Sequence, residues 1–108
     1  MTETIVVLCT LPDAAQAAAL GRTLVEEKLA ACVNLVPSLR SIYSWQGKLC
    51  DEAEVLCLIK TTQARFAALR ARICALHPYQ VPEVIALAVV DGHRPYLDWV
   101  RDSTSAAG

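Results

Sequence analysis

The chain has 108 residues, of which 55% are hydrophobic and 19% are charged, and its formal net charge is -1. This length fits one folded domain, and so apolar a composition argues against disorder and suggests that another subunit covers part of the surface. The near-neutral charge argues against binding to nucleic acid, and no apolar run approaches the roughly 20 residues of a membrane span. Since the N-terminus also lacks the positive segment of a signal peptide, we expect a cytoplasmic protein.

The first half of the chain predicts a strand, a helix and a long hairpin. Residues 4–11 are apolar and β-rich, which is typical of a buried strand. Asp13 and Gln16 form a capping-box pattern at the start of an alanine-rich helix over residues 14–29. Residues 32–45 and 48–61 then predict two strands joined by a turn at Gln46 and Gly47, with Pro37 marking an edge or a bulge.

The predicted hairpin is too long for its own domain. Each arm has about 14 residues and spans roughly 45 Å, whereas a globule of this length has a diameter of roughly 34 Å. We therefore expect the hairpin to project beyond the domain. Its tip carries Tyr43 and Trp45, and an exposed apolar tip is a liability unless a partner covers it.

The second half of the chain predicts a helix, a strand and a short final helix. The helix covers residues 63–76 and ends at His77-Pro78, because a residue that precedes proline disfavours helical geometry. A strand follows over residues 84–90, then a helix over residues 95–102 and a disordered tail over residues 103–108. The order β-α-β-β-α-β within a single domain, residues 1–108, predicts a ferredoxin-like α+β sandwich with a C-terminal helix.

Six motifs in this order cover about residues 4–101. They are Val6-Val7-Leu8-Cys9-Thr10, Glu27-Lys28-Leu29-Ala30-Ala31-Cys32-Val33-Asn34, Ser41-Ile42-Tyr43-Ser44-Trp45-Gln46-Gly47-Lys48, Ile59-Lys60-Thr61-Thr62, His77-Pro78-Tyr79-Gln80-Val81-Pro82-Glu83 and Tyr96-Leu97-Asp98-Trp99-Val100. Together they resemble the CutA family, the divalent-cation tolerance proteins. The resemblance implies a ferredoxin-like subunit in a tight homotrimer, with long strands that pair between subunits.

The resemblance also implies a metal site. Some family members look like copper binders, and their proposed ligands are a cysteine that ends the first strand and two histidines before Pro-Tyr. The matching residues here are Cys9 and His77, whereas Leu76 takes the place of the first histidine and cannot ligate. A thiolate and an imidazole suit copper or zinc, so we expect at most weak binding of copper or another divalent metal.

Two other interpretations of Cys9 and His77 remain open. Cys9 can be a buried core residue while His77 caps a helix end. The two residues can also be a nucleophile and its base, but no orienting group or oxyanion motif accompanies them. We therefore expect no enzymatic activity.

Three polar residues form a second candidate site. Lys60 ends an apolar strand, Glu83 precedes the next strand, and Tyr79 lies nearby in the sequence. The residues can form an ion pair at a subunit boundary, or they can bind a small molecule in a cleft between subunits. The trimeric PII proteins bind small molecules in this way on a shared architecture, so the second interpretation rests on analogy.

The large aromatic residues predict contacts between subunits. Tyr43, Trp45, Tyr96 and Trp99 are typical of interface anchors. Together with the resemblance to the CutA family, these residues imply a trimeric, non-enzymatic protein of divalent-metal (copper) tolerance. The alternative is a PII-like sensor or interaction module with its ligand between subunits.

Overall fold

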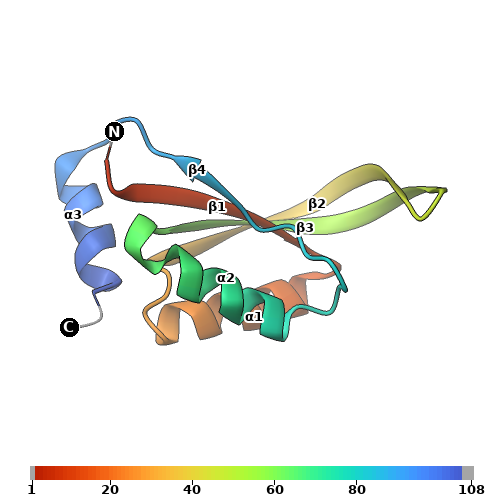
Figure 1. Ribbon diagram of the computed structural model, residues 1–108, viewed down its shortest axis with the longest axis horizontal. Coiled ribbons are helices and arrows are strands. Elements are labelled where there is room, and N and C mark those ends of the chain that lie inside the picture. The colour runs from red at the N-terminus through yellow and green to blue at the C-terminus, as the bar shows by residue number, and fades with distance from the viewer. Residues whose placement is uncertain (1, 106–108) are drawn as a thin grey trace.

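The computed structural model describes residues 2–105 as a four-stranded sheet with three α-helices (Figure 1). The elements are β1 (Thr4–Leu11), α1 (Ala14–Glu26), β2 (Cys32–Trp45), β3 (Lys48–Thr62), the 3₁₀ turn η1 (Gln63–Arg65), α2 (Phe66–Leu76), β4 (Ile85–Ala88) and α3 (Arg94–Ser103). The strand order is β2-β3-β1-β4, and every neighbouring pair is antiparallel. The predicted α+β class is confirmed.

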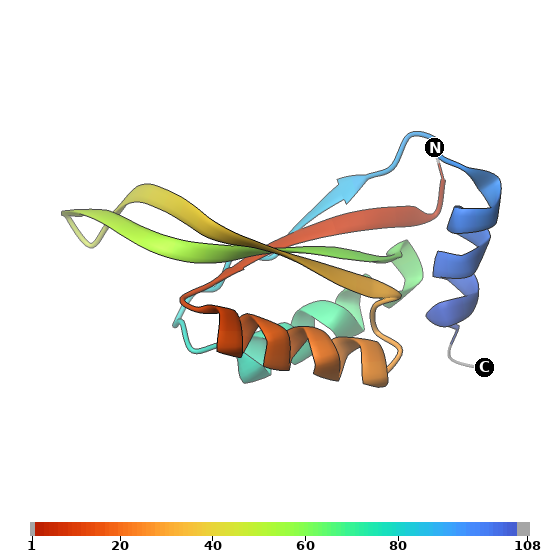
Figure 2. The ribbon, with the colours of Figure 1, turned by 180° about the vertical axis from the view of Figure 1, so that it is seen from behind.

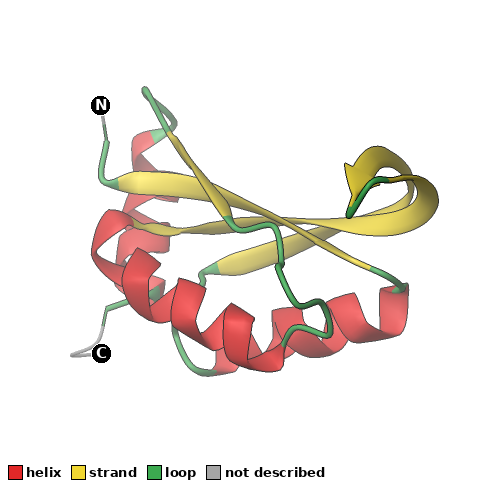
Figure 3. Ribbon diagram, turned by 45° about the vertical axis from the view of Figure 1, so that its right-hand side comes forward, coloured by secondary structure: helices red, strands yellow, loops and turns green. Residues whose placement is uncertain are grey.

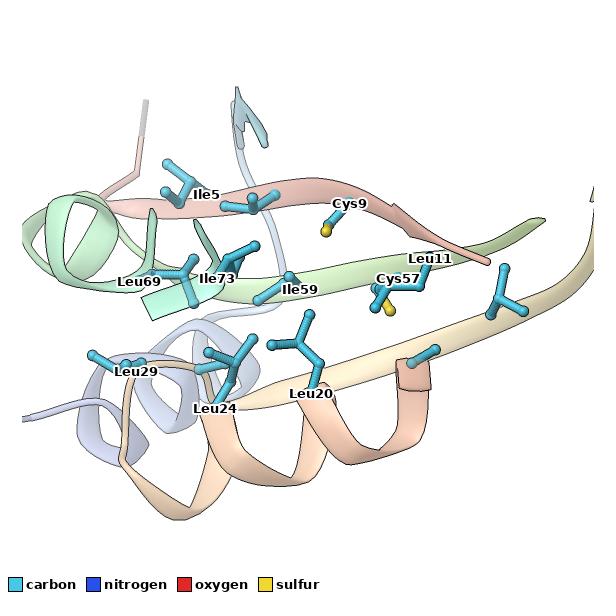
Figure 4. Close-up of a cluster of buried hydrophobic side chains, with 14 residues drawn as sticks. Ile5, Cys9, Leu11, Leu20, Leu24, Leu29, Cys57, Ile59, Leu69 and Ile73 are labelled. Carbon is cyan, nitrogen blue, oxygen red and sulfur yellow. The ribbon is translucent and has the colours of Figure 1, made fainter. Parts of the chain in front are cut away.

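The two longer helices cover one face of the sheet. Figure 2 shows α1 and α2 side by side beneath the strands, while α3 stands at the end of the sheet near the N-terminus. The core lies between the sheet and these two helices (Figure 4). Its members from β1 and β3 are alternate residues, as the two-residue period of a strand requires. The buried side chains of this layer include Ile5, Val7, Cys9, Leu11, Leu20, Leu24, Val55, Cys57, Ile59, Leu69 and Ile73.

The capping of α1 follows the prediction at its start but not at its end. Asp13 Oδ1 accepts a hydrogen bond from the Gln16 amide at 2.8 Å, and this contact satisfies one free N–H of the first turn. The helix ends at Glu26 rather than at residue 29. Lys28 takes a φ of 60°, and the amides of Leu29 and Ala30 turn back to the Leu24 carbonyl, which terminates the helix.

Three other boundaries differ from the prediction. β3 continues to Thr62, and α2 begins at Phe66, because residues 63–65 form a 3₁₀ turn. β4 is only four residues long. At the C-terminus, α3 includes Ser103, and the buried Thr104 hydroxyl donates to the Val100 carbonyl at 2.9 Å. The predicted disordered tail is therefore wrong at Ser103 and Thr104; residues 106–108 lie outside the described residues.

The hairpin projects beyond the rest of the molecule, as its length predicts. The longest extent of the molecule is 44 Å against 25 and 22 Å in the other directions, and Figures 1 and 2 show β2 and β3 running past the helical layer. Figure 3 shows this layer in red below the yellow strands. The pairing of β2 with β3 shifts between Val36 and Leu39, so the bulge predicted at Pro37 is confirmed. The turn uses Gln46 at φ 51° and Gly47 at φ 80°, left-handed geometry that glycine adopts without steric cost.

The second face of the sheet carries apolar side chains that α1 and α2 do not cover. We call it the open face and define it by Val6, Leu8, Leu56, Leu58, Ile85 and Leu87. Registered neighbours share a face, and these residues alternate with the core residues of β1 and β3. Ile85 and Leu87 are 49% and 48% exposed, so the open face presents apolar surface to its surroundings.

Candidate functional site

The ring of His77 is buried and both of its nitrogens are engaged. His77 follows the last turn of α2, and its Nδ1 accepts a hydrogen bond from the Tyr79 amide at 3.1 Å. Because Nδ1 accepts, Nε2 carries the proton, and it lies 2.7 Å from the Thr10 carbonyl oxygen, to which it donates. These two bonds tie the loop after α2 to the end of β1.

The structure brings Cys9 close to His77. The Cys9 thiol lies 3.9 Å from the Thr10 carbonyl oxygen, the same atom that His77 contacts. The distance between Cys9 Sγ and His77 Nε2 therefore cannot exceed the combined length of these two contacts. Burial, aided by the nearby Cys57 and Glu83, raises the pKa of Cys9 to about 12. The thiol is consequently protonated at neutral pH.

In this arrangement neither Cys9 nor His77 offers a free donor to a copper ion. The donor types suit copper, but a metal ligand must present a thiolate or an imidazole lone pair, and neither is free here. Leu76, the neighbour of His77, is 44% exposed and supplies no donor. Between residues 2 and 105 no group of three or more histidine, cysteine, aspartate or glutamate residues is placed to hold a metal ion.

A cavity of about 630 Å³ lies where the hairpin leaves the body of the molecule. We call it the hairpin-base cavity. Its walls come from the end of β1, from both arms of the hairpin and from the loop between α2 and β4. The lining residues are Thr10, Ser41, Ile42, Tyr43, Trp45, Glu54, Pro78, Tyr79, Gln80, Val81 and Glu83. The volume falls within the range of small-molecule sites.

A buried carboxylate anchors one wall of this cavity. The Tyr79 hydroxyl donates to Glu54 Oε2 at 2.7 Å, and Glu54 is only 6% exposed. Burial and the Glu54 carboxylate raise the pKa of Tyr79 well above its ordinary value. The Tyr79 ring also packs on His77 at 4.8 Å between centroids. Glu54 is absent from the residues singled out by sequence; its signal is an acidic residue that directly precedes the apolar run of β3.

The structure separates Lys60 from Glu83 within one chain. Tyr79 and Glu83 line the hairpin-base cavity, whereas Lys60 does not. Lys60 pairs in register with Val6, near the start of β1, and its ammonium group hydrogen-bonds the Asn34 side chain. The cavity lies at the other end of β1. The predicted pairing of Lys60 with Glu83 is not formed inside one subunit, and a pairing between subunits stays a prediction.

The four predicted interface aromatics fall into two separate pairs. Tyr43 and Trp45 lie on the hairpin and line the cavity, at 38% and 43% exposure. Tyr96 and Trp99 lie on α3, with their rings 5.5 Å apart and exposures of 42% and 45%. All four therefore present aromatic surface to the surroundings of the chain.

None of the helices between residues 2 and 105 is long and apolar enough to cross a membrane.

The sheet, the projecting hairpin and the cavity at its base define a small α+β protein of PII-like architecture. The model of the CutA1 divalent ion tolerance protein family matches residues 5–103, and the chain belongs to this family. It is 52% identical over 99 residues to the divalent-cation tolerance protein CutA of Thermus thermophilus, with 92% of this chain and 96% of the relative covered.

Two further relatives show how widely this architecture recurs. The chain is 47% identical over 97 residues to human protein CutA; 90% of this chain is covered, but only 54% of the longer human protein. A solved structure of the PII-like protein CutA from Nostoc superimposes with a TM-score of 0.88 at 41% identity and covers 94% of this chain and 97% of its own.

Proposed function

We propose that this chain is a non-enzymatic protein of divalent-cation tolerance that works in the cytoplasm as a homotrimer of ferredoxin-like subunits. Family membership supports the role in divalent-cation tolerance. The state of the candidate nucleophile supports the absence of turnover. With a pKa of about 12, Cys9 has almost no thiolate at neutral pH, and His77 has no nitrogen free to act as its base.

The open face is the observation that carries the proposed assembly. Ile85 and Leu87 are about half exposed beside the half-buried Val6, Leu8 and Leu58. A monomeric protein rarely leaves so continuous an apolar patch in water, and a second copy of the same sheet would cover it. The hairpin adds to this argument, since it extends past its own helices (Figure 1) and carries exposed Tyr43 and Trp45.

Light scattering after size exclusion tests the assembly. At micromolar concentration the protein should have about three times the mass of the chain. Trp45→Ala should weaken the assembly, because aromatic anchors contribute most of an interface's energy. Arg70→Ala is the matched control: Arg70 is an exposed residue of α2 that lies over its own neighbour Phe66. A stable folded monomer of the unmodified chain would contradict the proposal.

The hairpin-base cavity favours a second function, the binding of a small molecule in a cleft of the trimer. The cavity has the volume of a ligand site and combines apolar walls with the carboxylates of Glu54 and Glu83. In this function Tyr79 and Glu83 contact the ligand, and Lys60 contributes only from a neighbouring subunit. A thermal-shift screen of small metabolites should find stabilising ligands. Their stabilisation should be lost in Glu83→Gln.

Copper binding at Cys9 and His77 belongs to the proposal only as a weak interaction. A copper ion would have to displace the thiol proton of Cys9 and the hydrogen bond between His77 and Thr10. These requirements reduce the affinity that the donor types alone would provide. Isothermal titration of the reduced protein with copper tests the site, and Cys9→Ser should remove the binding.

A further inference from the structure

The hairpin-base cavity has a marked chemical bias. Two carboxylates, Glu54 and Glu83, and three aromatic rings, Tyr43, Trp45 and Tyr79, contribute to its lining. No lysine, arginine or histidine is among the lining residues. The described part of the chain thus surrounds this space with negative charge and aromatic faces, and supplies no positive charge to its walls.

Within residues 2–105 the two carboxylates have no cationic partner. Glu54 is 6% exposed and accepts a hydrogen bond from the neutral Tyr79 hydroxyl. Glu83 makes no hydrogen bond or ion pair with any residue between 2 and 105. None of the ion pairs found in this range involves either residue. Glu54 is buried and Glu83 is half-buried, and a carboxylate that is partly withdrawn from water is stabilised by a cation brought to it.

The aromatic residues favour the same kind of ligand. The face of a tyrosine or tryptophan ring attracts a cation that lies within about 6 Å of its centre, and the attraction grows when water is excluded. Trp45 and Tyr43 line the cavity from one arm of the hairpin, and Tyr79 lines it from the loop that follows α2. A ligand held by the carboxylates would therefore place its body against aromatic walls.

From these observations we infer that the hairpin-base cavity binds an organic cation, whose ammonium group lies at Glu54 and Glu83 and whose apolar body packs against Trp45, Tyr43 and Tyr79. The inference rests on the proposed small-molecule function of this cleft and names its ligand class. A carboxylate hydrogen-bonds an ammonium group directly, and an inorganic cation would leave the apolar walls without a partner.

The test uses three probes with similar aromatic bodies and different charges: phenethylammonium, 2-phenylethanol and 3-phenylpropionate. Of the two tryptophans of the chain, only Trp45 lines the cavity, so the Trp99→Phe variant reports binding through Trp45 fluorescence alone. We expect phenethylammonium to bind at least about tenfold more tightly than the alcohol, because a hydrogen bond to a charged group is the stronger one. The carboxylate probe should not bind.

Variants then locate the ammonium group. Glu83→Gln should weaken phenethylammonium binding by about tenfold or more and leave the alcohol unaffected. Glu26→Gln is the matched control, because Glu26 is an exposed carboxylate at the end of α1, outside the cavity. Light scattering of every variant checks that the assembly is unchanged. Glu54→Gln provides an independent second variant, in β3 rather than in the loop after α2, and should also weaken phenethylammonium binding.

Three results would overturn the inference. Equal binding of the ammonium and the alcohol would show that charge is not recognised, while small-molecule binding in the cleft would still stand. An equal loss in Glu83→Gln and Glu26→Gln would show only a general electrostatic effect. If phenethylammonium binds the Lys60→Met variant but not the unmodified chain, the Lys60 ammonium group of a neighbouring subunit already occupies the cavity. A monomeric mass in light scattering would instead contradict the trimer, independently of the probe results.

Discussion

The hydrogen bond from Tyr79 to Glu54 should stabilise the junction between the hairpin and the loop after α2. Tyr79→Phe removes only the hydroxyl that donates to Glu54 Oε2 at 2.7 Å and leaves the ring on His77 in place. A hydrogen bond to a charged group contributes about 1.5–3 kcal/mol. Glu54 is 6% exposed, so water cannot fully replace the lost donor. Since Tyr79 is only half-buried, we expect a loss near the lower limit, about 1.5–2 kcal/mol.

Guanidinium unfolding at a fixed protomer concentration measures this loss, because the stability of an oligomer depends on concentration. Tyr96→Phe is the matched control: its hydroxyl lies 3.5 Å from the Cys32 thiol at an exposed position, so its loss should cost less than about 0.5 kcal/mol. In the Glu54→Gln background, Tyr79→Phe should cost markedly less than in the unmodified chain. An equal cost in both backgrounds, or a cost no larger than the control's, would refute the reasoning.

Three further outcomes follow from the cysteines. In the native protein the exposed Cys74 should react first with a thiol reagent at pH 8, while Cys9 and Cys57 react only after unfolding, because both are fully buried with pKa values of about 12 and 11; rapid labelling of Cys9 would contradict this. The contribution of these two thiols to the free energy of unfolding should be constant below pH 9.0, the ordinary thiol value, and should be lost as pH rises towards 12, because the native state holds these protons more tightly than the unfolded chain; unchanged stability at pH 11 would contradict it. Copper affinity should fall about tenfold for each unit by which pH is lowered, since the metal releases the Cys9 proton, and Leu76→His should strengthen binding by adding an imidazole beside His77; titrations that show no gain in Leu76→His would end the comparison with the family's copper ligands.

Local patterns in the sequence determined the elements and the overhang. The alternation of apolar residues in β1 and β3, the Asp13 cap and the turn at Gln46-Gly47 depend on neighbours a few residues apart, and local stereochemistry decides them. Arm lengths alone predicted that the hairpin would outreach the domain, because the rise per residue of a strand is nearly constant. The exceptions were helix ends: the turn of Lys28 into left-handed geometry had no strong local signal.

Only the tertiary structure decided what the candidate residues can do. The strand register sets Lys60 beside Val6 and leaves it at the far end of the sheet from Glu83, although both residues adjoin apolar strands in the sequence. Folding also buries Glu54 in a hydrogen bond with the Tyr79 hydroxyl and engages both ring nitrogens of His77 in hydrogen bonds. Contacts between residues far apart in the chain set burial, hydrogen bonding and pKa. The residue types at Cys9 and His77 therefore suggest a metal site, but in the folded chain the thiol is protonated and both ring nitrogens are hydrogen-bonded.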